Sequence, residues 1–247
     1  MPNPILTVIT VCYNAEATIE RTLKSLDEQS FRLFEHLIID GASKDSTLNI
    51  IAEHTSPNRR IVSEPDKGLY DAMNKGLALA KGDYVVFLNS GDRFHSPDTL
   101  LHVSDAMLEN DYPGIVYGQT DLVDNEGRKL GPRHLTAPEI LTTDSFKDGM
   151  LICHQAFFVL RKITGKYDLK YSFSADYDWC IRCIDNSRRN FYLNEVLVDF
   201  LSEGMTSRNR RASLIERYKI MCRRYGTIST TLRHLKFACR WWFKRSA

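Results

Sequence analysis

The chain has 247 residues, a formal net charge of +2 and a hydrophobic fraction of 43%, a composition typical of a globular protein with its own core. It contains no apolar run of the roughly 18 residues that would span a bilayer, and its first residues lack the basic and apolar stretches of a signal peptide. We therefore expect a cytoplasmic protein with reduced cysteines, in which Cys180 and Cys183 are two thiols on one helix face rather than a zinc or redox pair.

Four apolar runs alternate with helical patterns in the first ninety residues. The runs cover residues 5–12, 36–39, 61–62 and 84–88. Helical spacing of apolar residues follows each of the first three runs, most clearly in the stripe Leu69, Ala72, Met73 and Gly76. Strands that alternate with helices predict an α/β fold with a mostly parallel sheet and right-handed crossovers.

The order of elements is less regular after residue 92. A helix is expected from residue 97, strands at 115–117, 122–123, 156–160 and 191–200, and a helix at 176–184. Residues 207–247 hold twelve basic residues and one acidic residue, Glu216, which gives them a charge of +11. The remainder has 21 basic and 30 acidic residues, so an acidic body precedes a basic helical extension that suits an anionic surface.

Polar clusters stand at the ends of the four predicted strands, where ligands bind in parallel sheets. These clusters are Tyr13-Asn14, Asp40-Gly41, Asp66-Lys67-Gly68 and Asn89-Ser90-Gly91-Asp92. Any one of them is common in a turn, but four on one edge are more specific. The G-x-G-x-x-G and G-x-x-x-x-G-K-[ST] patterns are missing, which argues against a dehydrogenase and a P-loop nucleotidase.

Four motifs carry a resemblance to a known family. VITVCYNAE, IIDGASKDST, SEPDKGLYDAMNKGLALAKGDYVVFLNSGD and SADYDW occur in this order. Together they resemble family 2 inverting glycosyltransferases with the GT-A fold, particularly bacterial transferases of exopolysaccharide or colanic-acid type assembly. The resemblance implies a GT-A domain over residues 1–206, with a donor-nucleotide half at 1–95 and an acceptor half at 96–206. Residues 207–247 would then be a basic amphipathic helical tail.

The resemblance assigns a nucleotide-sugar site to the sheet edge. Its residues are Tyr13, Asn14, Asp40, Asp66, Lys67, Asn74, Asn89, Ser90 and Gly91. Asp40 matches the carboxylate that binds the nucleobase, since a carboxylate can accept a base N–H. Residues 89–92 occupy the place of the D-x-D metal motif. Asp92 is the one carboxylate left there, and we expect it to bind Mg²⁺ or Mn²⁺.

SADYDW resembles the motif that carries the family's general base, which implies that Asp176 is the base, with Asp178 as the competing candidate. His154 and Gln155 stand where family members often carry His-Gln near the acceptor. The segment EGMT, residues 203–206, resembles a G-G-x-S turn that can close over the donor, with Glu203 in place of the usual glycine.

The implied activity is inverting transfer of a sugar from a nucleoside-diphosphate sugar to a hydroxyl of a saccharide acceptor, itself lipid-linked, in surface polysaccharide assembly. The tail would dock the enzyme on the anionic inner face of the membrane; a helix packed on the body or a dimer contact remains an alternative. Another nucleotide-sugar enzyme, such as a nucleotidyltransferase, is the rival enzymatic reading. We expect no nucleic acid partner, because no recognition module accompanies the basic tail.

Overall fold

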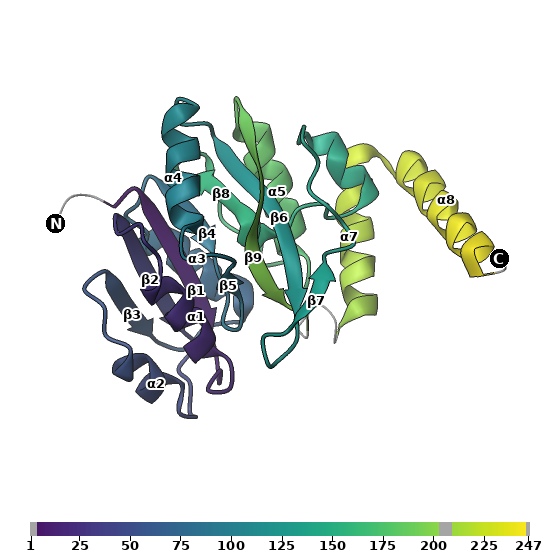
Figure 1. Ribbon diagram of the computed structural model, residues 1–247. Coiled ribbons are helices and arrows are strands. Elements are labelled where there is room, and N and C mark those ends of the chain that lie inside the picture. Colours follow the sequence, from purple (N-terminus) through teal and green to yellow (C-terminus); the bar gives the residue numbers. More distant parts are fainter. Residues whose placement is uncertain (1–3, 203–208, 246–247) are drawn as a thin grey trace.

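The computed structural model describes residues 4–202 and 209–245, which fold around one curled sheet flanked by helices (Figure 1). The strand order is β3-β2-β1-β4-β8-β6-β9-β5, and β7 pairs with β6. The first four are parallel, and their bounds are β1 Leu6–Cys12, β2 Phe34–Asp40, β3 Arg59–Ser63 and β4 Tyr84–Phe87. The register pairs Cys12 with Asp40, so the predicted polar clusters meet at one edge.

The sheet is mixed beyond β4. Its remaining strands are β5 Arg93–Phe94, β6 Ile115–Val123, β7 Lys129–Pro132, β8 Phe157–Leu160 and β9 Asn190–Leu201. β8 is antiparallel to both β4 and β6, whereas β9 is parallel to β6. The two short strands expected at 115–117 and 122–123 are one continuous strand with a shifted register near Gln119. The α/β class is confirmed, with its parallel part confined to the N-terminal half.

Helices cover both faces of the sheet. Their bounds are α1 Ile19–Asp27, α2 Thr47–Glu53, α3 Leu69–Leu79, α4 Thr99–Glu109, α5 Ala175–Asn186, α7 Arg210–Tyr225 and α8 Thr227–Arg245, with short 3₁₀ turns at Thr143–Asp148, His154–Ala156 and Arg161–Ile163. Side chains alternate along β1: Val8 shares a core with α1 and α4, while Ile9 and Val11 share one with α3 and α5. This alternation explains why β1 reads as a continuous apolar run.

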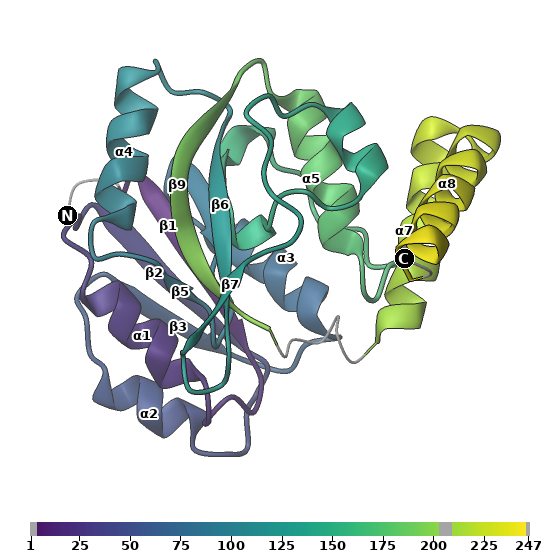
Figure 2. The same cartoon turned by 45° about the vertical axis from the view of Figure 1, so that its right-hand side comes forward.

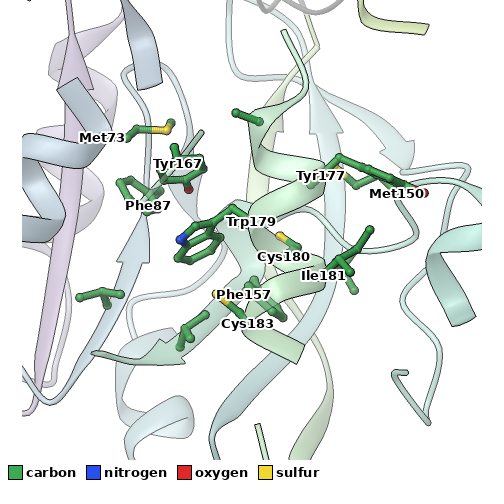
Figure 3. Close-up of a cluster of buried hydrophobic side chains, with 14 of the residues drawn as sticks. Met73, Phe87, Met150, Phe157, Tyr167, Tyr177, Trp179, Cys180, Ile181 and Cys183 are labelled. Atoms are coloured by element: carbon green, nitrogen blue, oxygen red, sulfur yellow. The ribbon is translucent and has the colours of Figure 1, made fainter. Parts of the chain in front are cut away.

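An aromatic cluster joins the two halves of the sheet (Figure 3). Trp179 of α5 stacks on Tyr167, with 5.0 Å between ring centroids, and meets Phe87 of β4 and Phe157 of β8 edge-on. Its indole N–H donates to the carbonyl of Gly165 at 2.7 Å. The cysteines at 180 and 183 are free and buried in the same core, as expected. Because Trp179 is fully buried, it fixes the position of α5.

The two C-terminal helices have different surroundings. α7 packs on the body, where Ile220 and Met221 are each 2% exposed and join the core of α3 and α5. α8 leaves the end of α7 and extends away from the sheet (Figure 1), with Ile228 exposed over 80% of its surface. Figure 2 shows α7 and α8 on the same side of the body. The packed body therefore continues through α7, past the expected boundary at residue 207. No helix among residues 4–202 and 209–245 is long and apolar enough to cross a membrane.

The turn between α3 and β4 makes a close contact with β1. Gly82 donates its N–H to the Thr7 hydroxyl at 2.9 Å, and a Cβ at this position would lie 2.5 Å from the Thr7 nitrogen. Because that neighbour is backbone, it cannot rotate away. We expect Gly82→Ala to lower the free energy of unfolding by about 1–3 kcal/mol, measured by urea denaturation. The exposed neighbour Lys81 provides the control: Lys81→Ala should change the free energy of unfolding by less than about 0.5 kcal/mol. Equal effects of the two changes would contradict the clash.

Candidate active site

A cavity of about 500 Å³ lies beyond the carboxyl ends of β1 and β4. α5 and the turn at His154–Ala156 border its other side. Eight of the predicted site residues line it: Tyr13, Asn14, Asn89, Ser90, Asp92, His154, Gln155 and Asp176. The fold thus brings together residues from both halves of the chain, separated by up to 163 positions, at the edge where the sequence predicted a ligand.

Tyr13 and Asn14 form the rim of the cavity. The ring of Tyr13 is 61% exposed, which leaves its face available to a planar ligand. Asn14 adopts a φ of 47°, and its Oδ1 accepts the N–H of Lys44 at 2.9 Å. Its own N–H donates to the Ser43 hydroxyl at 2.8 Å. Asn14 therefore fastens the loop after β2 and positions Tyr13.

Asp40 lies outside the cavity lining. Its carboxylate is fully buried and accepts the N–H of Ser43 at 3.0 Å and the hydroxyl of Ser63 at 2.6 Å. The Ser43 hydroxyl is a further donor. These contacts close the loop after β2 and leave no face of the carboxylate exposed to a nucleobase. Base recognition by Asp40 stays a prediction, and it would require these bonds to rearrange.

The predicted residues 66, 67 and 74 also lie outside the cavity lining. Asn74 makes a two-bond pair with the backbone of Tyr167, at 3.0 and 2.7 Å, which attaches α3 to the segment before α5. Asp66 accepts the N–H of Gly68 at 2.8 Å and faces Gly41, where a Cβ would lie 2.6 Å from its Oδ2. Lys67 is exposed. The contacts of Asn74 are thus structural, and its place beside the nucleotide stays a prediction.

Asp92 is held in a tight turn after β4. The Thr22 hydroxyl accepts the N–H of Gly91 and donates to the carbonyl of Asp92, at 2.9 and 2.7 Å. The Asp92 carboxylate accepts the N–H of Leu201 and the side-chain amide of Gln155, both at 2.9 Å. Burial raises the pKa of Asp92 to about 6, although both hydrogen bonds favour the ionised form. A cation beside this carboxylate would relieve the cost of burying its charge.

The oxygen atoms around Asp92 fit a hard divalent cation. Asn89 lines the same cavity, and its Oδ1 is buried with no hydrogen-bond partner among the described residues. A buried oxygen without a donor is available to a cation or to its bound water. Mg²⁺ commonly uses one or two protein carboxylates and takes its other ligands from phosphates and water. Asp92 and Asn89 are therefore suited to hold such an ion next to a phosphate-bearing ligand.

A second acidic cluster is already neutralised. Ligand atoms of His95, Asp121 and Asp199 lie within 4.8 Å of one another. Arg93 pairs with Asp199 at 2.7 Å, and Lys129 pairs with Asp121 at 2.5 Å. Because two cationic side chains occupy the carboxylates, the cluster is an ion-pair network between strands.

Asp176 lies in the first turn of α5. Its Oδ1 accepts the Tyr70 hydroxyl at 3.2 Å and the Tyr177 N–H at 2.9 Å, while His154 Nδ1 lies 3.5 Å from its Oδ2. Burial acts to raise the pKa of Asp176, but His154, Arg217 and the Tyr177 N–H outweigh it and hold the pKa below its usual value. The carboxylate is therefore ionised at neutral pH and can accept a proton.

Asp178, the competing candidate, is engaged elsewhere. Its carboxylate pairs with Arg182 at 2.8 Å along α5, and it does not line the cavity. His154 and Gln155 both reach the site: Gln155 bonds Asp92, and His154 faces Asp176. The Nε2 atom of His154 is buried without a partner among the described residues.

The cavity also contains residues that the sequence motifs did not indicate. Arg133, Arg217 and Tyr70 all line it. Tyr70 lies inside the longest motif, two residues after Gly68, but the motif assigned it no role. Its aromatic ring in a polar segment could have indicated a site residue. The two arginines lie outside every motif. Residues 203–206, predicted to close over the donor, fall outside the described residues.

Comparison with known sequences places this site in a family. The family model described as Glycosyl transferase family 2 matches residues 7–165. A PGL/p-HBAD biosynthesis glycosyltransferase of Mycobacterium bovis (strain BCG / Pasteur 1173P2) is 33% identical over 192 residues, which cover 75% of this chain and 72% of that protein. TuaG of Bacillus subtilis (strain 168), named for teichuronic acid biosynthesis, is 32% identical over 169 residues, 67% of this chain and 66% of that protein.

Solved structures share the fold at low sequence identity. S. aureus TarS 1-349 in complex with UDP-GlcNAc matches with a TM-score of 0.69 at 22% identity, over 87% of this chain and 64% of that one. The mannosyltransferase PcManGT from Pyrobaculum calidifontis, in complex with GDP-Man and Mn²⁺, matches with a TM-score of 0.63 at 18% identity, over 96% of this chain and 76% of that one. The aligned part is thus less than two thirds of the TarS fragment.

The raised pKa of Asp92 predicts a pH-dependent stability. The folded pKa of about 6 exceeds the usual aspartate value of about 3.9, so folding favours the protonated form. The resulting stability is present below about pH 4 and is lost as the pH rises through 6. In EDTA, the unfolding free energy of the wild type should fall by about 2 kcal/mol relative to Asp92→Asn between pH 4 and 7. Urea denaturation at a series of pH values measures this difference.

The exposed Asp105 provides the control for a general effect of removing one carboxylate. Parallel pH profiles for the wild type and Asp92→Asn would refute the prediction. So would an Asp105→Asn profile that diverges from the wild type as strongly as that of Asp92→Asn.

Proposed function

This chain belongs to glycosyl transferase family 2 and is therefore a glycosyltransferase; we propose that it inverts the anomeric centre of the sugar that it transfers. The donor is a nucleoside-diphosphate sugar, and the acceptor is a hydroxyl of a saccharide. One observation carries the proposal: the buried carboxylates of Asp92 and Asp176 border the same cavity, with one pKa raised and the other lowered. Two carboxylates in such different environments suit two different roles.

Asp176 is the general base in this proposal. It removes the proton from the acceptor hydroxyl while that oxygen bonds to the anomeric carbon, and the bond from the carbon to the diphosphate oxygen breaks. The diphosphate leaves with the electron pair, so a single displacement needs no nucleophile from the protein. The Tyr70 hydroxyl and the Tyr177 N–H hold Oδ1, which directs Oδ2 of Asp176 toward the His154 side of the cavity.

Asp92 and Asn89 hold a divalent metal, Mg²⁺ or Mn²⁺, in the proposed enzyme. When bound, such an ion neutralises negative charge on the departing diphosphate. Gln155 and the Leu201 N–H orient the Asp92 carboxylate by occupying one lone pair on each oxygen. Support for the metal also comes from the Mn²⁺ in the PcManGT complex.

The donor class rests on the fold neighbours, whose complexes contain UDP-GlcNAc and GDP-Man. Both uracil and guanine are compatible with the exposed Tyr13, since every base offers a face that can stack on an aromatic ring. The teichuronic acid name of TuaG supports a role in polysaccharide biosynthesis. The lipid-linked form of the saccharide acceptor is part of our proposal. Family membership favours a glycosyltransferase over the rival reading of a nucleotidyltransferase.

α8 supports a place on the inner face of the membrane. Ile228, Leu232 and Leu235 share one side of the helix at 80%, 63% and 57% exposure. Lys236 is exposed next to them. An amphipathic helix with basic neighbours lies in the interface of an anionic bilayer, where each basic residue contributes about 1 kcal/mol. A lipid-linked acceptor would be confined to the same surface.

The base assignment has a direct test. Asp176→Asn keeps the size of the side chain but cannot take a proton, so transfer should fall by the order of 10² or more. Binding of UDP or GDP with Mn²⁺, measured by calorimetry, should persist. Asp178→Asn is the matched control on the same helix, and its activity should stay near that of the wild type. An active Asp176→Asn together with an inactive Asp178→Asn would move the base by two residues.

The membrane contact can be tested without disturbing α7. Replacing Ile228, Leu232 and Leu235 by serine should abolish the salt-sensitive binding of the full chain to phosphatidylserine liposomes, measured by co-sedimentation. The same replacement of Leu108, Leu130 and Ile140, which are 63%, 59% and 80% exposed elsewhere on the molecule, provides the control. A wild-type chain that ignores anionic liposomes at low salt would leave α8 without a membrane role.

A further inference from the structure

One face of α7 contacts the segment that carries Asp176. The Glu216 carboxylate accepts three backbone N–H groups, from Ser172 at 2.8 Å, Phe173 at 2.8 Å and Ser174 at 3.0 Å. The Ser174 hydroxyl also bonds Ser213, one turn earlier on α7. These groups precede the first turn of α5, where backbone N–H groups lack intrahelical partners. α7 is therefore fastened directly beside the proposed base.

Arg217 follows Glu216 and lines the active-site cavity. Its guanidinium lies 5.7 Å from the centroid of the Tyr177 ring and donates one long bond, 3.4 Å, to the Ser213 hydroxyl. Its Nε atom is buried with no partner, and no carboxylate within the described residues lies within 4.0 Å of its nitrogens. The side chain thus brings into the cavity a positive charge that forms no ion pair with the described residues.

Arg133 is a second cation of this kind in the cavity lining. Its guanidinium donates to the carbonyls of Leu135 at 3.1 Å, Leu151 at 3.2 Å and Met150 at 2.7 Å. All three acceptors are neutral, and two of the five guanidinium N–H groups remain for another partner. Among the described residues, Arg133 also has no carboxylate within ion-pair distance.

The carboxylates of the cavity require nearby cations if a phosphate-bearing ligand is to enter. Asp92 and Asp176 contribute two carboxylates, and the proposed substrates bring phosphates as well. A phosphate-bearing group would enter against the repulsion of both carboxylates unless cations offset them. Arginine suits this place because its planar fork binds phosphate through two parallel hydrogen bonds and is always charged.

We propose that Arg217, assisted by Arg133, forms a phosphate-binding subsite on the Asp176 side of the cavity. The ligand is a phosphate-bearing group of a substrate, supplied either by the donor diphosphate or by the diphosphate of a lipid-linked acceptor. This inference rests on the proposed function. It makes α7 part of the substrate-binding machinery, although its sequence reads as the start of a basic tail.

The test compares Arg217→Met with Arg211→Met. Methionine keeps much of the packing on Tyr177 while removing the charge, and Arg211 is an exposed arginine of the same helix. Calorimetry with inorganic pyrophosphate in EDTA measures the subsite independently of any nucleobase or metal. We expect Arg217→Met to weaken pyrophosphate binding about tenfold or more and Arg211→Met to leave it within twofold. Arg217→Lys should recover part of the loss, since it restores the charge without the fork.

Two further titrations identify the source of the phosphate. If Arg217 binds the donor, Arg217→Met should weaken UDP or GDP binding with Mn²⁺ and leave uridine or guanosine binding unchanged. If it binds the acceptor, nucleoside diphosphate binding should be unaltered and the KM for a short-chain polyprenyl-diphosphate saccharide should rise about tenfold with little change in kcat.

The outcomes separate this inference from the proposed function. A wild type that binds pyrophosphate through Arg217 but neither binds UDP or GDP nor transfers sugar would refute the proposed function alone. Pyrophosphate binding that Arg217→Met leaves unchanged, in a correctly folded variant judged by circular dichroism, would overturn the subsite. An equal loss in Arg211→Met would also overturn it, because the effect would then be the general charge of α7.

Discussion

The stacking of Trp179 on Tyr167 is the contact on which the active site depends. It joins α5 to the core between β4 and β8, with 5.0 Å between ring centroids. Asp176 lies three residues before Trp179 in the same helix, about 4.5 Å along its axis. Tyr70 also stacks on Tyr167, and its hydroxyl donates a hydrogen bond to Asp176. Burial of these aromatic rings therefore fixes the position of the proposed base, together with the Glu216 contacts that precede α5.

Two buried carboxylates acquire opposite pKa shifts because their neighbours differ. The partners of Asp92 are mainly neutral donors, Leu201 and Gln155, so burial dominates and its pKa rises. Asp176 meets a histidine ring and the charge of Arg217, which outweigh the same penalty. The proposed roles follow this difference: a metal ion beside Asp92, and a proton transferred from the acceptor to Asp176.

Local sequence patterns were sufficient to predict features that depend on a single helix or strand. The stripe through Met73 and Gly76 identified α3, and the polar strand ends located the sheet edge where the cavity lies. Pairing between distant segments was harder, as the two-residue strand β5 exists only because β9 pairs with it. The sequence did not predict Arg217 as a site residue, because it is one of twelve basic residues in the segment 207–247. The isolated acidic Glu216 beside it was the available signal, since a lone carboxylate among many cations must face something other than them.

A single residue, Gly226, separates α7 from α8. Its φ of 83° turns the chain sharply, and Tyr218 holds the next helix through the Thr231 hydroxyl at 2.8 Å and the His234 ring at 5.2 Å. These contacts therefore fix the orientation of α8 relative to α7. A continuous set of contacts therefore connects α8 with the segment that precedes Asp176, from Tyr218 along α7 to Glu216 and Ser174.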